Sequence, residues 1–520
     1  MNRVPNELVA TTDRGERATC DASTRIRWVF VMVIVLVAFT TISPSGQSLD
    51  RPRASTFAIE HVRLIDGTGA PAKADQTIVV DHGRIRSVGP APSIAVPPNA
   101  EVIQVPDGTV IPGLVGMHDH LFYQLESAES GQITVPAQET FAHLYLATGV
   151  TTIRTAGTLD FEGDLRLKER IDAGNETGPR IFLTSGYLGA TTPEPDPDGV
   201  ARLVNQYADG GATSIKAYTT LRSSELRAAI AAAHKRGMRV TGHLCAVGFR
   251  EAASLGIDNI EHGLPFDTEF YSGKRFDECP DQNSVIAEIV NMDIGDVEIR
   301  RTIDVLIRNN VAVTSTLAVL ESVTGVPADR RVRPLLASSL QEVYDAAAKV
   351  RTDPHTRISA LFSAAFQKEK EFERTFVAAG GTLMAGVDPT GWGGVAAGFG
   401  DQHELELLVA AGFPAEQAIQ IASSNGARFL RQPDIGTIAA GKKADLVVIR
   451  GDLVRDIHRI RNVDFVVKDG VTYDPAELIE PAQGTIGAFD MSRLFTWPVL
   501  GIATLVPALV LVRWRRASRR

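Results

Sequence analysis

The stretch VIPGLVGMHDHLFY, residues 110–123, joins an apolar run to two histidines, His118 and His120, that are separated by one residue. In a β-strand the residues i and i+2 point to the same face, so both imidazoles are expected to reach one site at the end of this strand. Two histidines at this spacing are weak evidence by themselves, because surface and core histidines show it too. A metal site requires further ligands from elsewhere in the chain.

The sequence after residue 111 alternates short apolar runs with helix-like segments such as SSELRAAIAAAHKRG (223–237) and VGFREAASLG (247–256), each ending in glycine. This alternation predicts a parallel sheet with crossover helices. Seven further apolar runs follow the one that carries His118, and eight strands are the number that closes a (β/α)8 TIM barrel. The seven runs are GVTTIRTAG, PRIFLTSG, ATSIKAYTT, MRVTGHL, GIDNIEHG, VAVTSTLA and GTLMAGVD. Residues 320–380 exceed one connecting helix and predict an inserted helical pair over the barrel mouth.

Polar side chains stand at or near the ends of several of these runs: Lys216, His243, His262 and Asp388. The carboxyl ends of barrel strands meet at one mouth, where barrel enzymes hold their chemistry. Imidazole and carboxylate ligands suit zinc or a similar divalent ion. We therefore predict that the opening histidine pair and these four residues form a metal site.

The flanks of the barrel are rich in β-branched residues and turn signals. Segments 55–112 and 433–475 are expected to pair into one small β-sandwich domain. The barrel is expected to span 113–432, and residues 476–494 read as a linker.

Both ends of the chain carry apolar runs next to arginines. Residues 1–45 are expected to form a cytoplasmic n-region followed by a signal peptide or anchor, and its cleavage is left open. Residues 495–512 are an uncharged run of transmembrane length, with a buried core helix as the alternative. Because the tail 513–520 is rich in arginine, we expect it in the cytoplasm and the catalytic region outside, as a membrane-anchored, extracytoplasmic domain.

Composition excludes some partners. The net charge is −9 and no basic patch stands out in the central region, which argues against nucleic acid as a partner. The three cysteines, Cys20, Cys245 and Cys279, predict no disulfide framework. The expected partners are a small-molecule substrate and the membrane through the terminal segments, and a homo-oligomer stays open.

The chain resembles the amidohydrolase superfamily of metal-dependent hydrolases, and within it the imidazolonepropionase-like and prolidase-like branch. The resemblance covers nearly all of residues 55–475. The segments that carry it are VIPGLVGMHDHL, GVTTIRTAG, GATSIKAY, VTGHL, NIEHG, AGVD and GTIAAGKKADLVVIRGD. It implies a (β/α)8 barrel with a β-sandwich built from both chain ends.

The resemblance also implies the roles of the site residues, with two divalent ions, most often zinc. One ion would be held by His118, His120 and Asp388, and the other by His243 and His262. Lys216, carbamylated by carbon dioxide, would bridge the two ions; this needs a neutral amine, and burial near two cations would lower the lysine pKa. The chain departs from the family at Gly116, where aspartate is frequent, and at Arg154-Thr155, where the family often has RD.

The expected reaction is attack of a metal-bridging hydroxide on an amide carbonyl, with Asp388 as general base and then acid. Tyr218 and Arg222 are candidate substrate contacts; the alternatives are a packed aromatic and a solvated loop charge. The leading substrate class is a dipeptide or N-acyl amino acid. The alternatives are a cyclic amide, lactone or phosphotriester, and an inactive membrane-tethered binding protein on the same fold.

Overall fold

The computed structural model describes residues 55–488 apart from 128–130, 191–195, 354–356 and 391–392. Within these residues, no helix combines the length and the apolar character needed to cross a membrane. The predicted N-terminal segment 1–45 and the predicted span 495–512, with the basic tail 513–520, lie outside the described residues.

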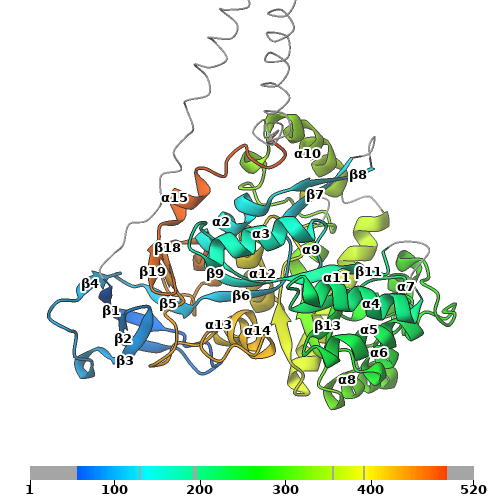
Figure 1. The fold of residues 1–520 in the computed structure, drawn as a ribbon, viewed down its shortest axis with the longest axis horizontal. Helices are drawn as coiled ribbons and strands as arrows, with labels where there is room; N and C mark the ends of the chain where they lie inside the picture. Colours follow the sequence, from blue (N-terminus) through cyan, green and yellow to red (C-terminus); the bar gives the residue numbers. More distant parts are fainter. Residues whose placement is uncertain (1–54, 128–130, 191–195, 354–356, 391–392, 489–520) are drawn as a thin grey trace, which may run out of the picture. The chain divides into compact units, whose positions relative to one another are not determined.

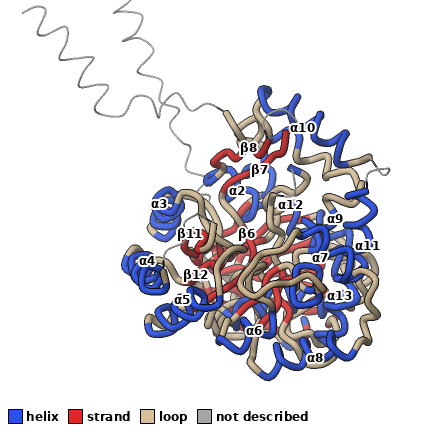
Figure 2. The backbone as a smooth tube through the Cα atoms, turned by 90° about the vertical axis from the view of Figure 1, so that its right-hand side faces the viewer, coloured by secondary structure: helices blue, strands red, loops and turns tan. Residues whose placement is uncertain are grey.

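A parallel barrel forms the centre of the described chain (Figures 1 and 2). Its strands form a three-stranded sheet, β10-β9-β6, and a six-stranded sheet, β11 to β16 in chain order. The bounds are β6 (Leu114–Asp119), β9 (Val150–Thr155), β10 (Arg180–Phe182), β11 (Thr184–Leu188), β12 (Ser214–Ala217), β13 (Arg239–Gly242), β14 (Asn259–Glu261), β15 (Ala312–Ser315) and β16 (Leu383–Ala385). These strands coincide with the eight predicted apolar runs, the third of which is broken into β10 and β11.

Hydrogen bonds join the two sheets into a closed ring. The backbone N–H groups of Val387 and Asp388, just after β16, donate to the carbonyl oxygen of His118 at the end of β6, at 3.1 and 2.9 Å. On the other side, Thr184 N donates to Thr155 Oγ1 at 2.8 Å, which ties β11 to β9. The last strand therefore closes against the first one next to the histidine pair.

Helices connect successive strands and surround the barrel (Figure 2). They are α2 (Gln138–Ala147), α3 (Phe161–Asp172), α4 (Pro197–Asp209), α5 (Ser223–Lys235), α6 (Phe249–Leu255), α7 (Gln282–Ile289), α8 (Val297–Arg308), α9 (Leu317–Glu321), α10 (Ser338–Arg351), α11 (Arg357–Ala378), α12 (Phe399–Ala410), α13 (Ala415–Gln420) and α14 (Gly426–Phe429). Local signals set several ends: Asp196 accepts from Gly199 N before α4, and Gly256 ends α6 with a φ of 96°. The two helices expected from the sequence over 223–237 and 247–256 are α5 and α6.

A second sheet of eight strands combines both flanks of the barrel segment. Its order is β19-β18-β17-β5-β1-β2-β3, with β4 paired to β1. Its strands are β1 (Thr56–Leu64), β2 (Lys73–Asp81), β3 (Arg84–Pro90), β4 (Glu101–Gln104), β5 (Thr109–Pro112), β17 (Leu446–Ile449), β18 (Val463–Lys468) and β19 (Val471–Tyr473). The antiparallel pair β5–β17 brings the two flanks together, and β5 leads almost directly into β6. The short helix α15 (Pro475–Ile479) follows in the segment read as a linker.

Two insertions lie near the carboxyl ends of the strands. The hairpin of β7 (Phe122–Ser127) and β8 (Gly131–Pro136), which the sequence reading did not expect, follows His120 directly. Helix α10 contacts β7, and α11 then leads into β16. The segment 320–380 therefore holds two long helices, but it differs from the predicted inserted pair, because α10 is the insertion and α11 is the regular barrel helix.

Candidate metal centre

The carboxylate of Asp388 lies at the centre of the candidate site. Its oxygens are 3.3 Å from His120 Nε2, 3.7 Å from His118 Nε2 and 3.9 Å from His262 Nε2. The histidines end β6 and β14, and Asp388 follows β16, so the closed barrel brings them together. Asp388 and His262 have φ values of 46° and 67°, a region unfavourable for residues other than glycine and frequent at functional sites.

The imidazole nitrogens are oriented towards a common centre. His120 Nδ1 donates to the carbonyl oxygen of Gly157 at 3.2 Å, and His262 Nδ1 is hydrogen-bonded to Thr316 Oγ1 at 2.9 Å. These bonds fix the rings and leave Nε2 of each to face the site. His262 Nε2 and His118 Nδ1 are buried and have no hydrogen-bond partner within the described structure. Unpartnered buried nitrogens of this kind are what a metal ion would satisfy.

His243, directly after β13, completes the histidine cluster. Its ring centroid lies 4.5 Å from that of His262, whose ring in turn lies 4.6 Å from that of His118. Burial, together with neighbouring cations, holds the pKa of His118 and of His243 well below the usual value, and burial lowers that of His262 to about 4. All three imidazoles are therefore neutral near pH 7, which is the form that binds a metal ion. The donor set fits a divalent ion such as zinc.

Lys216 lies on β12 in the barrel interior, with 1% of its side chain exposed. Burial, aided by Arg154, lowers its pKa well below the usual value, although Asp388 opposes the shift. Its Nζ donates to Glu261 Oε2 in a fully buried ion pair. A depressed amine pKa agrees with the condition for carbamylation, and in this structure the amine is held by a carboxylate that the sequence reading had not singled out.

Glu261 is therefore a further member of the site. Its Oε1 accepts from Thr241 Oγ1 at 2.7 Å and lies 3.5 Å from His118 Nδ1. Ligand atoms of His118, Glu261 and His262 lie within 4.8 Å of one another, as do those of His118, His120 and Asp388. The prediction rests on one polar residue at or near the end of each strand, and in NIEHG that residue is His262, directly after Glu261. The alternation Asn259, Glu261 along β14 was the signal that would have found it.

The two predicted substrate contacts have different positions. Tyr218 follows β12 at the edge of the site, and its ring centroid is 5.3 Å from that of His243. Burial raises its pKa, so its hydroxyl stays protonated and can donate. Arg222 does not reach the cavity: it precedes α5 and pairs through Nε and a terminal nitrogen with Glu225, whose side chain is only 1% exposed. The guanidinium is held by this buried carboxylate, and the role of Arg222 as a substrate contact stays a prediction.

The two departures from the family pattern have local explanations. A Cβ on Gly116 would lie 1.8 Å from Oδ2 of the buried Asp119, so the carboxyl group of Asp119 occupies the space of a side chain at 116. Burial, and then the charge of Asp401, raise the pKa of Asp119 well above its usual value. Arg154 is 1% exposed and donates to Asn259 Oδ1 at 2.9 Å and to Glu261 Oε1 at 3.4 Å. It supports the barrel interior beneath the histidines.

One expectation about the cysteines is wrong. Cys245, two residues after His243, forms a disulfide with Cys279. The sequence spacing of 34 residues gave no sign of this pair, because it joins the loop after β13 to the segment after β14. Cys245 is thus buried in a cross-link beside the site.

A cavity of about 330 Å³ opens onto the centre. Its polar floor includes His243, His262 and Asp388. The hairpin β7–β8 contributes Gln124, Leu125, Glu126 and Gln132, and the remaining wall is largely apolar, with Phe266, Val319, Leu320, Val323 and Phe362. Among the described residues that line it, none is lysine or arginine. The cavity is large enough for a small substrate with an apolar substituent.

A comparison with protein-family profiles identifies one family. The profile described as "Amidohydrolase family" matches residues 109–473. The curated 5-methylthioadenosine/S-adenosylhomocysteine deaminase of Halalkalibacterium halodurans is 58% identical over 36 residues, a match that spans 7% of this chain and 8% of that protein.

Several solved structures share the fold. A Xaa-Pro dipeptidase with methionine bound in its active site is 24% identical, with a TM-score of 0.61 and coverage of 81% of this chain and 100% of the other. A prolidase complexed with N-methylphosphonate-L-proline is 19% identical, with a TM-score of 0.57 and coverage of 80% and 99%. Phenylurea hydrolase B is 20% identical, with a TM-score of 0.59 and coverage of 84% and 100%.

Proposed function

Because the chain belongs to the amidohydrolase family and is a hydrolase acting on carbon–nitrogen bonds, we propose that it is a binuclear enzyme that cleaves a small amide, such as a dipeptide or an N-acyl amino acid. The observation that carries the proposal is the Asp388 carboxylate, surrounded at 3.3–3.9 Å by three buried histidines. Members of the family generally bind divalent metal ions. A barrel mouth with this donor set supports the same chemistry here.

The residues divide into two ligand groups in the proposal, with zinc as the expected metal. His118, His120 and Asp388 would hold one ion, and His243 and His262 the other, with Lys216 as a carbamate between them. When bound there, divalent ions would supply an activated water molecule and polarise the scissile carbonyl. Neutral imidazoles and a lysine of lowered pKa support this assignment.

Asp388 is the proposed proton carrier. Burial raises the pKa of Asp388, but the hydrogen bond from His120 and the charges that His120, His262 and Lys216 carry when protonated outweigh it and hold the pKa below the usual value. The group is therefore a carboxylate at neutral pH, ready to accept a proton from the attacking water. Delivery of that proton to the leaving nitrogen would complete the cleavage.

The cavity wall restricts the substrate. Phe266, Leu320 and Phe362 favour an apolar substituent, and the absence of lysine and arginine among its described lining residues argues against a dedicated clamp for a carboxylate. The Tyr218 hydroxyl is the proposed donor to the carbonyl oxygen of the substrate. Small amides with bulky apolar groups are thus the preferred members of the proposed class.

The experiment is a metal count and a substrate screen on the full-length chain, loaded with zinc and bicarbonate. Two metal ions per chain and cleavage of apolar dipeptides or N-acyl amino acids are expected. Asp388→Asn should lower kcat by about 10²–10⁴-fold while the fold, followed by circular dichroism, is retained. Near-normal turnover in Asp388→Asn would refute its role. If the enzyme bound two metal ions but cleaved lactones or phosphotriesters and no amide, the alternative substrate class would replace the proposed one.

We further propose that the barrel lies outside the cytoplasm, anchored by the terminal segments. The Cys245–Cys279 disulfide supports this, since disulfides persist mainly in oxidising compartments. A reporter enzyme that is active only after export should stay inactive when fused after Arg520, because the arginine-rich tail is expected inside. The same reporter fused after Ala488 is the control and should be active. Activity of the Arg520 fusion would contradict the proposed topology.

A further inference from the structure

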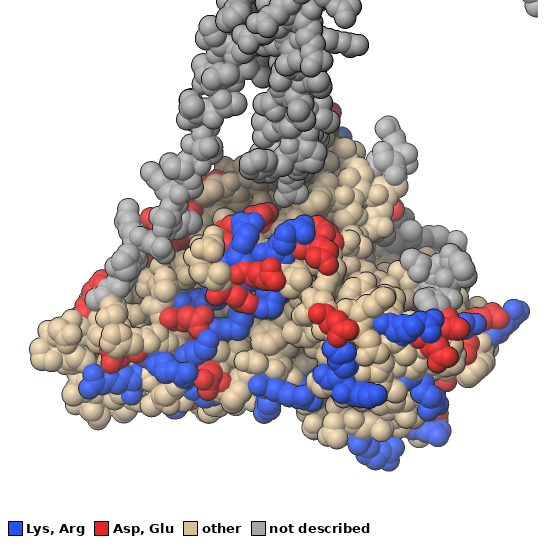
Figure 3. All heavy atoms as spheres, in the orientation of Figure 1, with Lys and Arg blue, Asp and Glu red and all other residues tan. Residues whose placement is uncertain are grey.

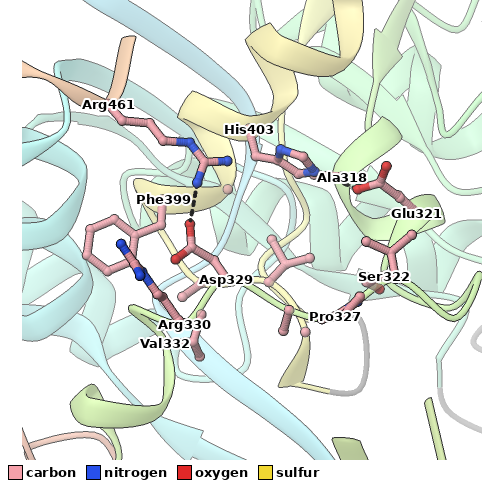
Figure 4. A pocket seen from close by; sticks show the side chains of 16 residues that line it. Ala318, Glu321, Ser322, Pro327, Asp329, Arg330, Val332, Phe399, His403 and Arg461 are labelled. Carbon is pink, nitrogen blue, oxygen red and sulfur yellow. Dashed lines mark hydrogen bonds and ion pairs between the residues drawn. The ribbon is translucent and has the colours of Figure 1, made fainter. Parts of the chain in front are cut away.

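A second cavity, of about 430 Å³, lies beside the metal centre and shares no lining residue with it (Figure 4). Two loops at the carboxyl ends of the last barrel strands form most of it: residues 318–332 after β15, and residues 394–400 before and at the start of α12. Arg461, at the end of the 3₁₀ helix η8 (Ile457–Arg461), closes one side. Its size suits a small organic molecule.

Helix α9 forms the partition between the two cavities. Ala318, Glu321 and Ser322 line the second cavity. Val319, Leu320 and Val323 line the cavity at the metal centre. A group bound in the second cavity would therefore touch the opposite side of the same helical turn that shapes the proposed substrate site.

The polar groups of the second cavity form a paired network. His403 contacts Glu321 Oε2 at 2.5 Å (Figure 4), and its other ring nitrogen lies 2.8 Å from Glu406 Oε2. Burial opposes its charge, but these hydrogen bonds raise the pKa of His403 to about 9, so the ring is cationic at neutral pH. Arg461 donates to both oxygens of Glu406 at 2.6 Å and to Asp329 Oδ2 at 3.4 Å.

Arg331 completes this network by binding Asp329, with contacts from 2.7 to 3.1 Å. Three carboxylates are thus matched by three cations: Glu321, Asp329 and Glu406 by His403, Arg331 and Arg461. Arg330 adds a positive charge at the exposed edge of the cavity and makes no hydrogen bond or ion pair with any described residue. The second cavity therefore presents one unmatched cation.

The remaining wall is apolar. Its members include Val326, Pro327, Ala328, Val332, Val395 and the ring of Phe399. An unmatched guanidinium beside an apolar wall selects a ligand with one negative charge and a hydrophobic body. We propose that this second cavity binds a small organic carboxylate with an apolar body, and that its occupancy is transmitted to the metal-centre cavity through α9.

The transmission has a physical route in the contacts of α9. At its start, the backbone N–H groups of Leu317 and Ala318 donate to the buried carboxylate of Glu404 on α12, at 3.2 and 2.8 Å. At its end, Glu321 binds His403 of the same helix α12. A ligand whose apolar body packs against Ala318 acts on a helix held at both ends by α12, so a small displacement of the helix also moves Leu320 on its other side.

The ligand class also fits the chemistry of the molecule. Cleavage of an amide releases a carboxylic acid, so a product of the reaction could itself bind in the second cavity. The link between the ligand and the reaction product rests on the proposed function, whereas binding of a carboxylate in the second cavity does not. The experiment below measures binding without turnover.

The test is titration of the full-length protein with phenylacetate, with phenylacetamide as the uncharged analogue, by isothermal calorimetry. Arg330→Gln should weaken phenylacetate binding by about 10-fold or more, the worth of one charge-assisted hydrogen bond. The matched control is Arg227→Gln, which removes an exposed arginine on α5 and should leave the affinity unchanged. Ala328→Phe, which fills the cavity from its wall, should also abolish binding, and phenylacetamide should bind weakly to every variant.

Amide hydrogen exchange with and without phenylacetate tests the coupling. Slower exchange over residues 317–323 in the wild type, absent in Arg330→Gln, is the expected result. Phenylacetate affinity that is the same in Arg330→Gln and wild type would overturn the site, and would assign any binding to the metal centre. Protection confined to residues 326–332 would overturn the coupling through α9.

Discussion

At the residue scale, Glu261 links the proposed metal ligands to the barrel interior. It binds Lys216 and Thr241, lies 3.5 Å from His118 Nδ1 and accepts from Arg154, all within a region closed to solvent. A buried carboxylate with two cationic neighbours is costly to remove, since each cation would stay behind without its partner. Glu261 thus positions both Lys216 and His118.

The variant Glu261→Gln is therefore expected to lower the free energy of unfolding by about 3–5 kcal/mol and to reduce the metal bound per chain. Denaturant unfolding and metal analysis measure the two effects. The control is Glu225→Gln, which also breaks a buried carboxylate–arginine pair but lies away from the centre. Glu225→Gln should lower the free energy of unfolding without changing the metal content. An equal loss of metal in both variants would contradict a positioning role for Glu261.

At the scale of elements, the segment after β14 is fastened across the end of β13. It contains η3 (Leu264–Phe266) and η4 (Thr268–Phe270) and returns to the Cys245–Cys279 disulfide. Lys274 Nζ adds hydrogen bonds to the carbonyl oxygens of Cys245 and Ala246 at 2.9 and 2.6 Å. These links hold the loop that follows His243 and thereby one wall of the metal centre.

Removal of the cross-link in Cys245→Ala/Cys279→Ala should lower the free energy of unfolding by about 3–4 kcal/mol, because the unfolded chain loses a closed loop of 34 residues. Thermal unfolding with and without a reducing agent is the measurement. Reductant should lower the Tm of the wild type and of Cys20→Ser, and leave the double variant unchanged. A reductant effect of the same size in the double variant would show that another change is responsible.

At the scale of the whole molecule, charged side chains connect the barrel to the segment before β18. Glu406 on α12 accepts from His403 on the same helix and from Arg461 at the end of η8. On the face drawn in Figure 3, acidic and basic side chains are interspersed, as paired charges of this kind require. The network thus stabilises the contact between α12 and η8 as well as the second cavity.

The pH dependence of stability should reveal this network. The pKa of His403 is raised to about 9 in the folded chain, against about 6.5 when unfolded. Its contribution to stability is therefore fully present below pH 6.5 and is lost as pH rises through 9. Since 32% of the side chain is exposed, screening reduces the contribution to about 1–2 kcal/mol.

Denaturant unfolding at pH 6 and pH 10 measures the contribution of His403, as the difference in free energy of unfolding between wild type and His403→Gln at each pH. Other titrating groups contribute equally to both proteins and cancel. His458→Gln is the control, because His458 contacts the same Glu406 but is 72% exposed and should change little. Parallel stability curves for wild type and His403→Gln would contradict the assignment.

Much of the fold was readable from local patterns. The apolar runs, the glycine stops and the polar residues at strand ends are properties of neighbouring residues, so the strands of the barrel and the six expected ligands could be predicted from them. The hairpin after His120 was not predicted, although β8 alternates between exposed and half-buried residues from Gln132 to Pro136, as a strand with one solvent-facing side does. The pairing of Arg222 with Glu225 was not predictable, because it depends on which carboxylate the fold buries.

The sequence by itself determined the parallel barrel and the identity of the residues at its mouth, because strand period and strand ends are local. Only the tertiary structure decided which of them meet: ring closure puts Asp388 against His118, and the barrel interior places Glu261 under Lys216. It also decided the cysteine pair and the second cavity behind α9. These depend on contacts between segments far apart in the chain, whose distances no local pattern encodes.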